Sequence, residues 1–83
     1  MDFEIYELIF DGCGCMLSNM DTTLEDDGTV LLTLDGQDFD VGSDFNKIID
    51  FLETRNDLTF DIQSYPDGCG CYSWSASISI VKN

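Results

Sequence analysis

One stretch of this chain decides the fold that we expect: residues 72–81, which read YSWSASISIV. Large or apolar side chains alternate there with serine, and successive residues of a β-strand point to opposite faces of a sheet. The serine row consists of Ser73, Ser75, Ser77 and Ser79. The pattern therefore predicts a strand with one face in the core and the other in solvent, as antiparallel sheets commonly have.

The segment before this strand predicts its partner. Residues 58–65 alternate in the same way, and the turn-forming residues at 66–68 are expected to end the strand. In a hairpin of the two strands, Asp61 lies beside the serine row on the outer face. We expect this face to be polar and negatively charged.

A helix is predicted over residues 43–55. Ser43 suits the N-cap position, and Arg55 in the last turn suits the helix dipole. Apolar residues at spacings i, i+3, i+4 and i+7 form one stripe, namely Phe45, Ile48, Ile49 and Leu52. We expect this amphipathic helix to cover the apolar face of the sheet.

The N-terminal segments are less regular. Residues 3–10 predict a strand whose alternation slips at Glu7, and a helix is the alternative there. Residues 18–28 are polar and predict a loop, because they contain no clear apolar period.

A hairpin is predicted after this loop. Residues 29–34 alternate cleanly, and Asp35-Gly36 is typical of a two-residue hairpin turn, so residues 37–41 are expected to return as a strand. The element order is then β-β-β-α-β-β. It predicts a single small acidic α+β domain over residues 1–83, whose mainly antiparallel sheet has about five strands and one helix packed on one face.

The pentapeptide DGCGC occurs twice, at residues 11–15 and 67–71, and contains all four cysteines. In the predicted topology both copies follow strands that run in the same direction, so both loops lie at one end of the sheet. Four thiolates there would suit one tetrahedral zinc ion. The expected ligands are Cys13, Cys15, Cys69 and Cys71.

Other uses of these cysteines stay open. Structural zinc sites usually place two or more residues between paired cysteines, whereas a single glycine separates each pair here. An iron–sulfur cluster is a weaker match to the same ligands. Disulfide exchange within or between the loops would make a redox module. In the simplest case the thiols only pack as small apolar groups.

Composition excludes several classes of function. The chain has 17 acidic and three basic residues, a net charge of −14, and no histidine. Such a charge repels nucleic-acid phosphates, and the absence of histidine and of a phosphate-binding loop argues against an enzyme. The acidic runs do not have calcium-loop spacing. No apolar segment approaches the ~20 residues of a membrane span and the first residues are acidic, so we expect a cytoplasmic protein.

The charge either favours a basic partner or only keeps the protein soluble. A tiny acidic α+β domain is similar in profile to protein inhibitors that occupy nucleic-acid-binding clefts, such as phage anti-defence (anti-CRISPR) and toxin-neutralising immunity proteins. We therefore expect an inhibitor that blocks the basic groove of a nuclease or other nucleic-acid-binding protein by charge mimicry, and the zinc or thiol module is the alternative. The expected partner contacts are Asp21, Glu25, Asp26, Asp27, Asp38, Asp40, Asp61, Ser73, Ser75 and Ser77.

Overall fold

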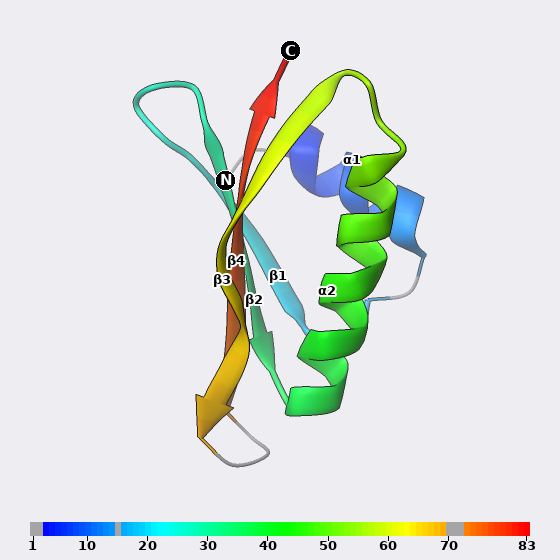
Figure 1. Cartoon of the computed structure of the whole chain (residues 1–83), viewed down its shortest axis with the longest axis vertical. Helices are drawn as coiled ribbons and strands as arrows, with labels where there is room; N and C mark the ends of the chain where they lie inside the picture. Colours follow the sequence, from blue (N-terminus) through cyan, green and yellow to red (C-terminus); the bar gives the residue numbers. More distant parts are fainter. Residues whose placement is uncertain (1–2, 15, 70–72) are drawn as a thin grey trace.

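The structure is a computed structural model that describes residues 3–14, 16–69 and 73–83. Within these residues the element order is α1 (Phe3–Cys13), β1 (Asn19–Leu24), β2 (Val30–Gly36), α2 (Asp38–Glu53), β3 (Leu58–Cys69) and β4 (Ser73–Lys82). Both helices lie on one side of the sheet (Figure 1). The predicted α+β class with an antiparallel sheet is confirmed, but the described part has two helices and four strands, one helix more and one strand fewer than expected.

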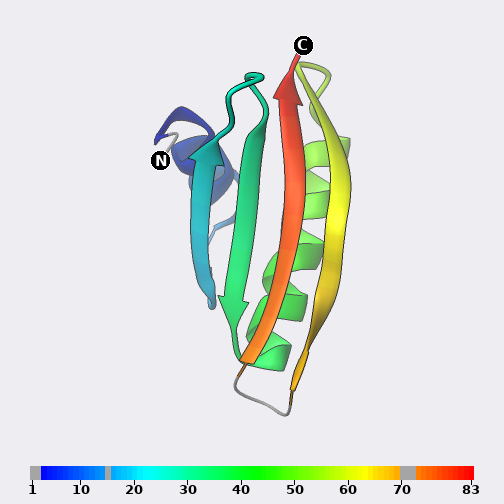
Figure 2. The same cartoon turned by 90° about the vertical axis from the view of Figure 1, so that its left-hand side faces the viewer.

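The strands are ordered β1-β2-β4-β3, and every neighbouring pair is antiparallel. β2 and β4 occupy the centre of the sheet, and β1 and β3 form its edges (Figure 2). The predicted hairpin between the last two strands is confirmed, since Asp61 pairs with Ser79 and Asp67 with Ser75. This pairing fixes which polar side chains share the outer face.

The core fills the space between the sheet and the helices. Most of the apolar residues predicted to face inward from β2, α2 and β4 are buried there, whereas Ile49 and Trp74 are only partly buried. This burial is the main source of stability in a domain of this size. The fully buried aliphatic side chains are Ile5, Ile9, Leu32, Leu34, Val41, Ile48, Ile78 and Ile80.

The N-terminal segment is a helix, so the strand predicted for residues 3–10 is wrong. Ile5 and Ile9 are fully buried and lie four residues apart, on one face of a helix. Tyr6 stacks on Phe10 at the same spacing, with ring centroids 5.9 Å apart. The i, i+4 spacing therefore outweighs the β propensity of the aromatic residues.

The second helix begins earlier than the sequence predicts. α2 starts at Asp38, so residues 37–41 are not a return strand, and Ser43 lies inside the helix rather than at its start. Val41 is fully buried four residues before Phe45 and extends the apolar stripe by one turn. Burial of this extra turn favours the helix over the hairpin.

Two segments that were expected to be irregular belong to strands. Residues 18–28 contain β1, in which the buried side chains of Met20 and Thr22 alternate with exposed ones. β3 continues through Pro66, where the sequence predicted its end, as far as Cys69. The register shifts between Ile62 and Ser64 and again between Ser64 and Asp67, and the second shift spans the proline, which an edge strand tolerates.

A buried carboxylate joins α2 to the chain that enters β1. Asp44 is fully buried and accepts hydrogen bonds from the backbone N–H groups of Leu17 (2.9 Å) and Ser18 (2.6 Å), and from the Ser18 hydroxyl. These bonds satisfy the carboxylate of Asp44, which would otherwise be buried without partners. Asp44 thereby fixes the start of β1 against the helix layer.

Candidate functional site

The face of the sheet that points away from the helices is not covered by any described element (Figure 2). We call it the open face. The strand register arranges its side chains in rows across the sheet: Asn19, Asp35, Ser75 and Asp67; then Asp21, Thr33, Ser77 and Ser64; then Thr23, Leu31, Ser79 and Asp61. Each row contains at least one carboxylate, and apart from Leu31 the other side chains are short and polar.

The carboxylates of the open face are close enough to act together. Asp35 and Asp67 are separated by two strand spacings, about 10 Å. This distance is close to the Debye length of about 10 Å at 0.1 M salt, so their fields overlap. The carboxylates of this face are all exposed, and they are Asp21, Asp35, Asp61 and Asp67.

The three basic residues of the chain lie away from the open face. Lys82 Nζ is 2.8 Å from the Glu4 carboxylate of α1, and Lys47 belongs to α2. Arg55, just past α2, donates two hydrogen bonds of 2.7 and 2.9 Å to Asp57, and this pairing lowers the pKa of the Asp57 carboxyl. Across the part of the sheet that the structure describes, the open face therefore has no positive charge.

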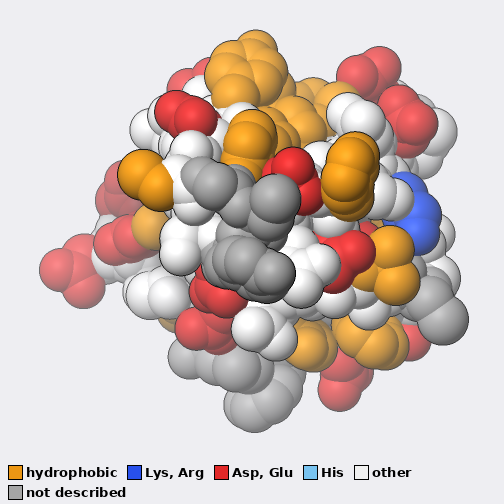
Figure 3. Space-filling model, turned by 90° about the horizontal axis from the view of Figure 1, so that it is seen from below, with side chains coloured by type: hydrophobic (Ala, Val, Ile, Leu, Met, Phe, Trp, Pro, Cys, Tyr) orange, Lys and Arg blue, Asp and Glu red, His pale blue; other side chains and the backbone are white. Residues whose placement is uncertain are grey.

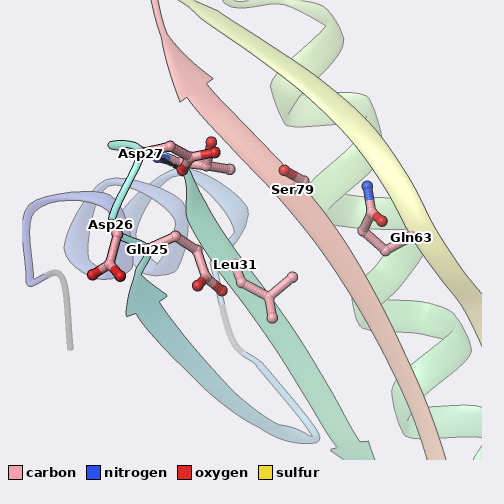
Figure 4. Close-up of a pocket in the computed structure, with 7 residues that line it drawn as sticks. Glu25, Asp26, Asp27, Leu31, Gln63 and Ser79 are labelled. Carbon is pink, nitrogen blue, oxygen red and sulfur yellow. Dashed lines mark hydrogen bonds between the residues drawn. The ribbon is translucent and has the colours of Figure 1, made fainter.

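A turn closes one end of the open face. The Thr29 N–H donates a hydrogen bond of 3.0 Å to the Asp27 carboxylate, which lowers the pKa of that carboxyl. The Glu25 N–H donates to the Thr29 carbonyl at 2.7 Å and closes the turn. Beside the turn lies an open hollow of about 560 Å³ (Figure 4). Its lining consists of Glu25, Asp26, Asp27, Thr29, Leu31, Gln63 and Ser79.

The opposite end of the molecule combines carboxylates with exposed aromatic groups. Seen from that end, acidic side chains are spread around the surface, apolar ones lie among them, and a basic group appears at one edge (Figure 3). Phe39 in the first turn of α2 is 84% exposed. Tyr65 of β3 is 67% exposed and contacts Phe45, with ring centroids 5.8 Å apart. A partner at this end would meet both charge and apolar surface.

Most of the predicted contact residues lie on or beside the open face. Asp38 and Asp40 do not, because they belong to the first turn of α2 instead of the expected return strand. Carboxylates in that turn interact favourably with the helix dipole, so stabilisation of α2 accounts for acidic residues at these two positions. The predicted residues that the sheet brings together are Asp21, Asp61, Ser73, Ser75 and Ser77, with Glu25, Asp26 and Asp27 in the adjoining turn.

Sequence reasoning missed two carboxylates of the open face. The sequence pattern predicts Asp35 in a hairpin turn and Asp67 in the turn that ends a strand. Both belong to strands and share one row with Ser75. The two-residue period of β2 identifies Asp35 as an outward residue, because Leu32 and Leu34 face inward.

The two copies of the cysteine repeat lie in different elements. Cys13 ends α1, is half-buried, and its thiol donates to the Lys47 carbonyl of α2 at 3.6 Å. Burial raises the pKa of the Cys13 thiol above its ordinary value. Cys69 ends β3 and is exposed. The expectation that both copies follow strands running in one direction is therefore wrong, because the first copy begins within a helix.

The predicted zinc site cannot be built from the described residues alone, since Cys15 and Cys71 lie outside them. Figure 1 shows the end of α1 beside α2, whereas β3 ends at the far end of the sheet. In the part of the chain that the structure covers, no group of three or more Cys, Asp or Glu side chains is arranged to hold a metal ion. The four-cysteine site stays a prediction.

Comparisons with known proteins give no assignment for this chain. No protein-family model, no curated protein and no solved structure matches it. Neither of the helices in residues 3–14, 16–69 and 73–83 has the length and apolar character needed to cross a bilayer. The function must therefore be inferred from the geometry and charge of the surface.

Proposed function

We propose that the protein is a small cytoplasmic inhibitor, not an enzyme, which binds the basic groove of a nuclease or other nucleic-acid-handling protein by charge mimicry. One observation supports this most directly: among the described residues, the open face presents carboxylates and hydroxyls and neither lysine nor arginine. A groove that binds phosphates is lined by lysine and arginine, and it would be attracted to this face. Phage anti-defence and immunity-like proteins would both use such a surface.

The form of the open face suits this role as well as its charge does. The side chains between the carboxylates are short, so long basic side chains of a partner can reach Asp21 or Asp35 without steric obstruction. An exposed ion pair contributes only about 0.2–1 kcal/mol, so affinity would come from several pairs formed together. The net charge of −14 would also accelerate association at low salt.

Two variants with equal net charge test the proposal. The open-face variant combines Asp21→Asn, Asp35→Asn and Asp61→Asn. The helix-layer variant also removes three charges, through the exposed changes Glu7→Gln, Asp50→Asn and Glu53→Gln. Each is immobilised beside the unmodified protein, and a panel of purified nucleases and other DNA-binding proteins is passed over all three.

We expect at least one panel member to bind at low salt, to be displaced by duplex DNA, and to weaken steeply as salt rises. For it, the open-face variant should bind about tenfold more weakly than the helix-layer variant, because three exposed ion pairs together amount to about 1.4 kcal/mol. Equal weakening of the two variants, or a dissociation constant that does not change with ionic strength, would contradict charge mimicry by the open face.

The zinc or thiol alternative has its own test. It predicts stoichiometric zinc in protein purified without chelator, measured by elemental analysis, and equal loss of that zinc in Cys13→Ser and Cys69→Ser. If the purified protein contains no zinc and its thiols are found to be reduced, zinc binding by the cysteines is contradicted.

A further inference from the structure

The hollow beside the β1–β2 turn has three kinds of lining, contributed by three separate segments. The turn supplies carboxylates, and Thr29 and Leu31 lead from it into β2. Ser79 of β4 and Gln63 of β3 complete the lining across the sheet. In Figure 4, Glu25 extends from the turn toward Leu31, and Gln63 lies on the far side of Ser79. The hollow thus combines an acidic wall, an apolar floor and a polar far wall.

The hydrogen-bond pattern leaves acceptors available at both walls. Asp27 is occupied by the Thr29 N–H, whereas the Glu25 carboxylate has no hydrogen bond or ion pair to another described residue. The Gln63 side-chain N–H₂ donates to Asp61 at 3.3 Å, which orients the amide and leaves its carbonyl oxygen as an acceptor. A ligand of the hollow would therefore need hydrogen-bond donors for both the Glu25 carboxylate and the Gln63 carbonyl oxygen.

Leu31 distinguishes an organic cation from a metal ion. It is the one apolar residue in the three rows of the open face defined above, and it is only partly exposed. An aliphatic floor offers a metal ion no ligand, and the described residues contain no group of three or more Cys, Asp or Glu side chains arranged to hold one. A side chain with an aliphatic stem and a charged head fits both parts of the hollow.

Arginine fits this chemistry better than lysine. Its planar guanidinium has five N–H donors, so it can bind the Glu25 carboxylate in a bidentate manner and still donate to the Gln63 carbonyl. Its three-carbon stem would pack on Leu31. Lysine offers the same charge, but from a single point and without the planar fork.

We propose that this hollow receives an arginine side chain of the basic partner and is the anchoring subsite of the open face. The inference rests on the function proposed above and adds a specific residue type and location to it. It gives a role to Leu31, which lies among polar residues in the three rows and which charge mimicry alone does not require.

The test is an NMR titration of the full chain with a short oligoarginine peptide, with an oligocitrulline peptide as the neutral isosteric control. Two variants alter the hollow: Glu25→Gln removes its free carboxylate, and Leu31→Thr removes its apolar floor without changing net charge. Asp35→Asn is the matched control, because it removes one carboxylate from the open face outside the lining of the hollow. Circular dichroism checks that each variant is folded.

We expect oligoarginine to shift the backbone signals of Leu31, Gln63 and Ser79, and oligocitrulline to leave them unchanged. Glu25→Gln and Leu31→Thr should each bind oligoarginine about threefold more weakly than Asp35→Asn does, which is the scale of one exposed ion pair or one partly buried aliphatic contact. Oligolysine should bind the unmodified protein more weakly than oligoarginine of the same length.

One set of results would contradict the arginine subsite alone, and another would contradict the proposed function as well. If oligoarginine binds in a salt-dependent manner but all three variants weaken it equally, or Leu31→Thr has no effect, the hollow is not an arginine subsite and charge mimicry stands. If oligoarginine does not bind even at low salt, the proposed function fails together with the inference.

Discussion

Replacing Asp44 by asparagine tests how the helix layer is fixed to the sheet. The carboxylate is fully buried and receives the N–H groups of Leu17 and Ser18 at 2.9 and 2.6 Å, as well as the Ser18 hydroxyl. Asparagine has nearly the same shape but only one acceptor oxygen. Its amide N–H₂ therefore faces a donor where the native side chain offers an acceptor.

The expected cost follows from these contacts. A hydrogen bond to a charged group contributes about 1.5–3 kcal/mol and a neutral one about 0.5–1.5 kcal/mol, so two retained backbone bonds lose about 2 kcal/mol together. A donor left without an acceptor costs about 1–3 kcal/mol more, and removing a buried charge offsets part of this. We expect Asp44→Asn to lower the free energy of unfolding by about 2–3 kcal/mol, a large share of the roughly 4–12 kcal/mol expected for a domain of this size.

Urea unfolding followed by far-ultraviolet circular dichroism measures this change. Asp50→Asn is the matched control, because it removes an exposed carboxylate from the same helix and corrects for reduced repulsion in this acidic protein. Ser18→Ala, which removes only the hydroxyl donor, should cost about 1 kcal/mol. An Asp44→Asn variant whose stability lies within about 0.5 kcal/mol of Asp50→Asn would refute the stabilising role of these hydrogen bonds.

Five further outcomes follow from the same structure. Gly68→Ala should destabilise the protein by about 1–3 kcal/mol in urea, because a Cβ there would overlap the backbone of the neighbouring strand β4; an unchanged midpoint would contradict this. Gly12→Ala should also destabilise the protein by about 1–3 kcal/mol, because a Cβ there would lie within 2.8 Å of three ring atoms of Phe51, so the two helices or the ring would have to move. Cys13 should be alkylated more slowly than exposed Cys69 in peptide-resolved mass spectrometry, and equal rates would contradict the burial of Cys13. Because burial raises the pKa of Cys13, its contribution to stability should be present below its ordinary pKa of 9.0 and fall as pH rises above it, a dependence that Cys13→Ala should remove. Because hydrogen bonding lowers the pKa of Asp27, its contribution should be present above 3.8 and be lost as pH falls below that value; an NMR titration midpoint at or above 3.8 would contradict this.

The sequence predicts the C-terminal half of this fold well because its periods are unambiguous. The alternation in residues 72–81 can be satisfied only by a strand buried on one face, and β4 pairs as that pattern requires. The apolar stripe through Phe45, Ile48 and Leu52 similarly identifies α2. In both segments, local pattern and tertiary burial favour the same structure.

The N-terminal half was predicted poorly because two periods compete there. Residues 3–10 are rich in aromatic and β-branched side chains, which favour strands, yet Ile5 and Ile9 also share a helix face. Asp35-Gly36 is typical of a hairpin turn, but the burial of Val41 makes a helix the better continuation. Packing against the rest of the chain decides both cases, and a local pattern does not contain that information.

The cysteine repeat shows most clearly what sequence similarity can and cannot establish. Gly12 lies in α1 against the Phe51 ring of α2, whereas Gly68 lies in β3 against the Ser73 carbonyl of β4. Glycine permits a close approach in both copies, but to different neighbours and in different backbone conformations. Identical residues therefore do not imply an equivalent environment for the cysteine that follows each glycine.

This difference separates the two functional hypotheses experimentally. Cys13 belongs to the helix layer, on the opposite side of the sheet from Asp21 and Asp35. A function of the open face should therefore survive Cys13→Ser as long as the domain remains folded, and it should be lost when the carboxylates are neutralised. A function of the cysteines should show the reverse pattern. Because Cys13 and the open-face carboxylates lie in different layers, this pair of variants distinguishes the two surfaces.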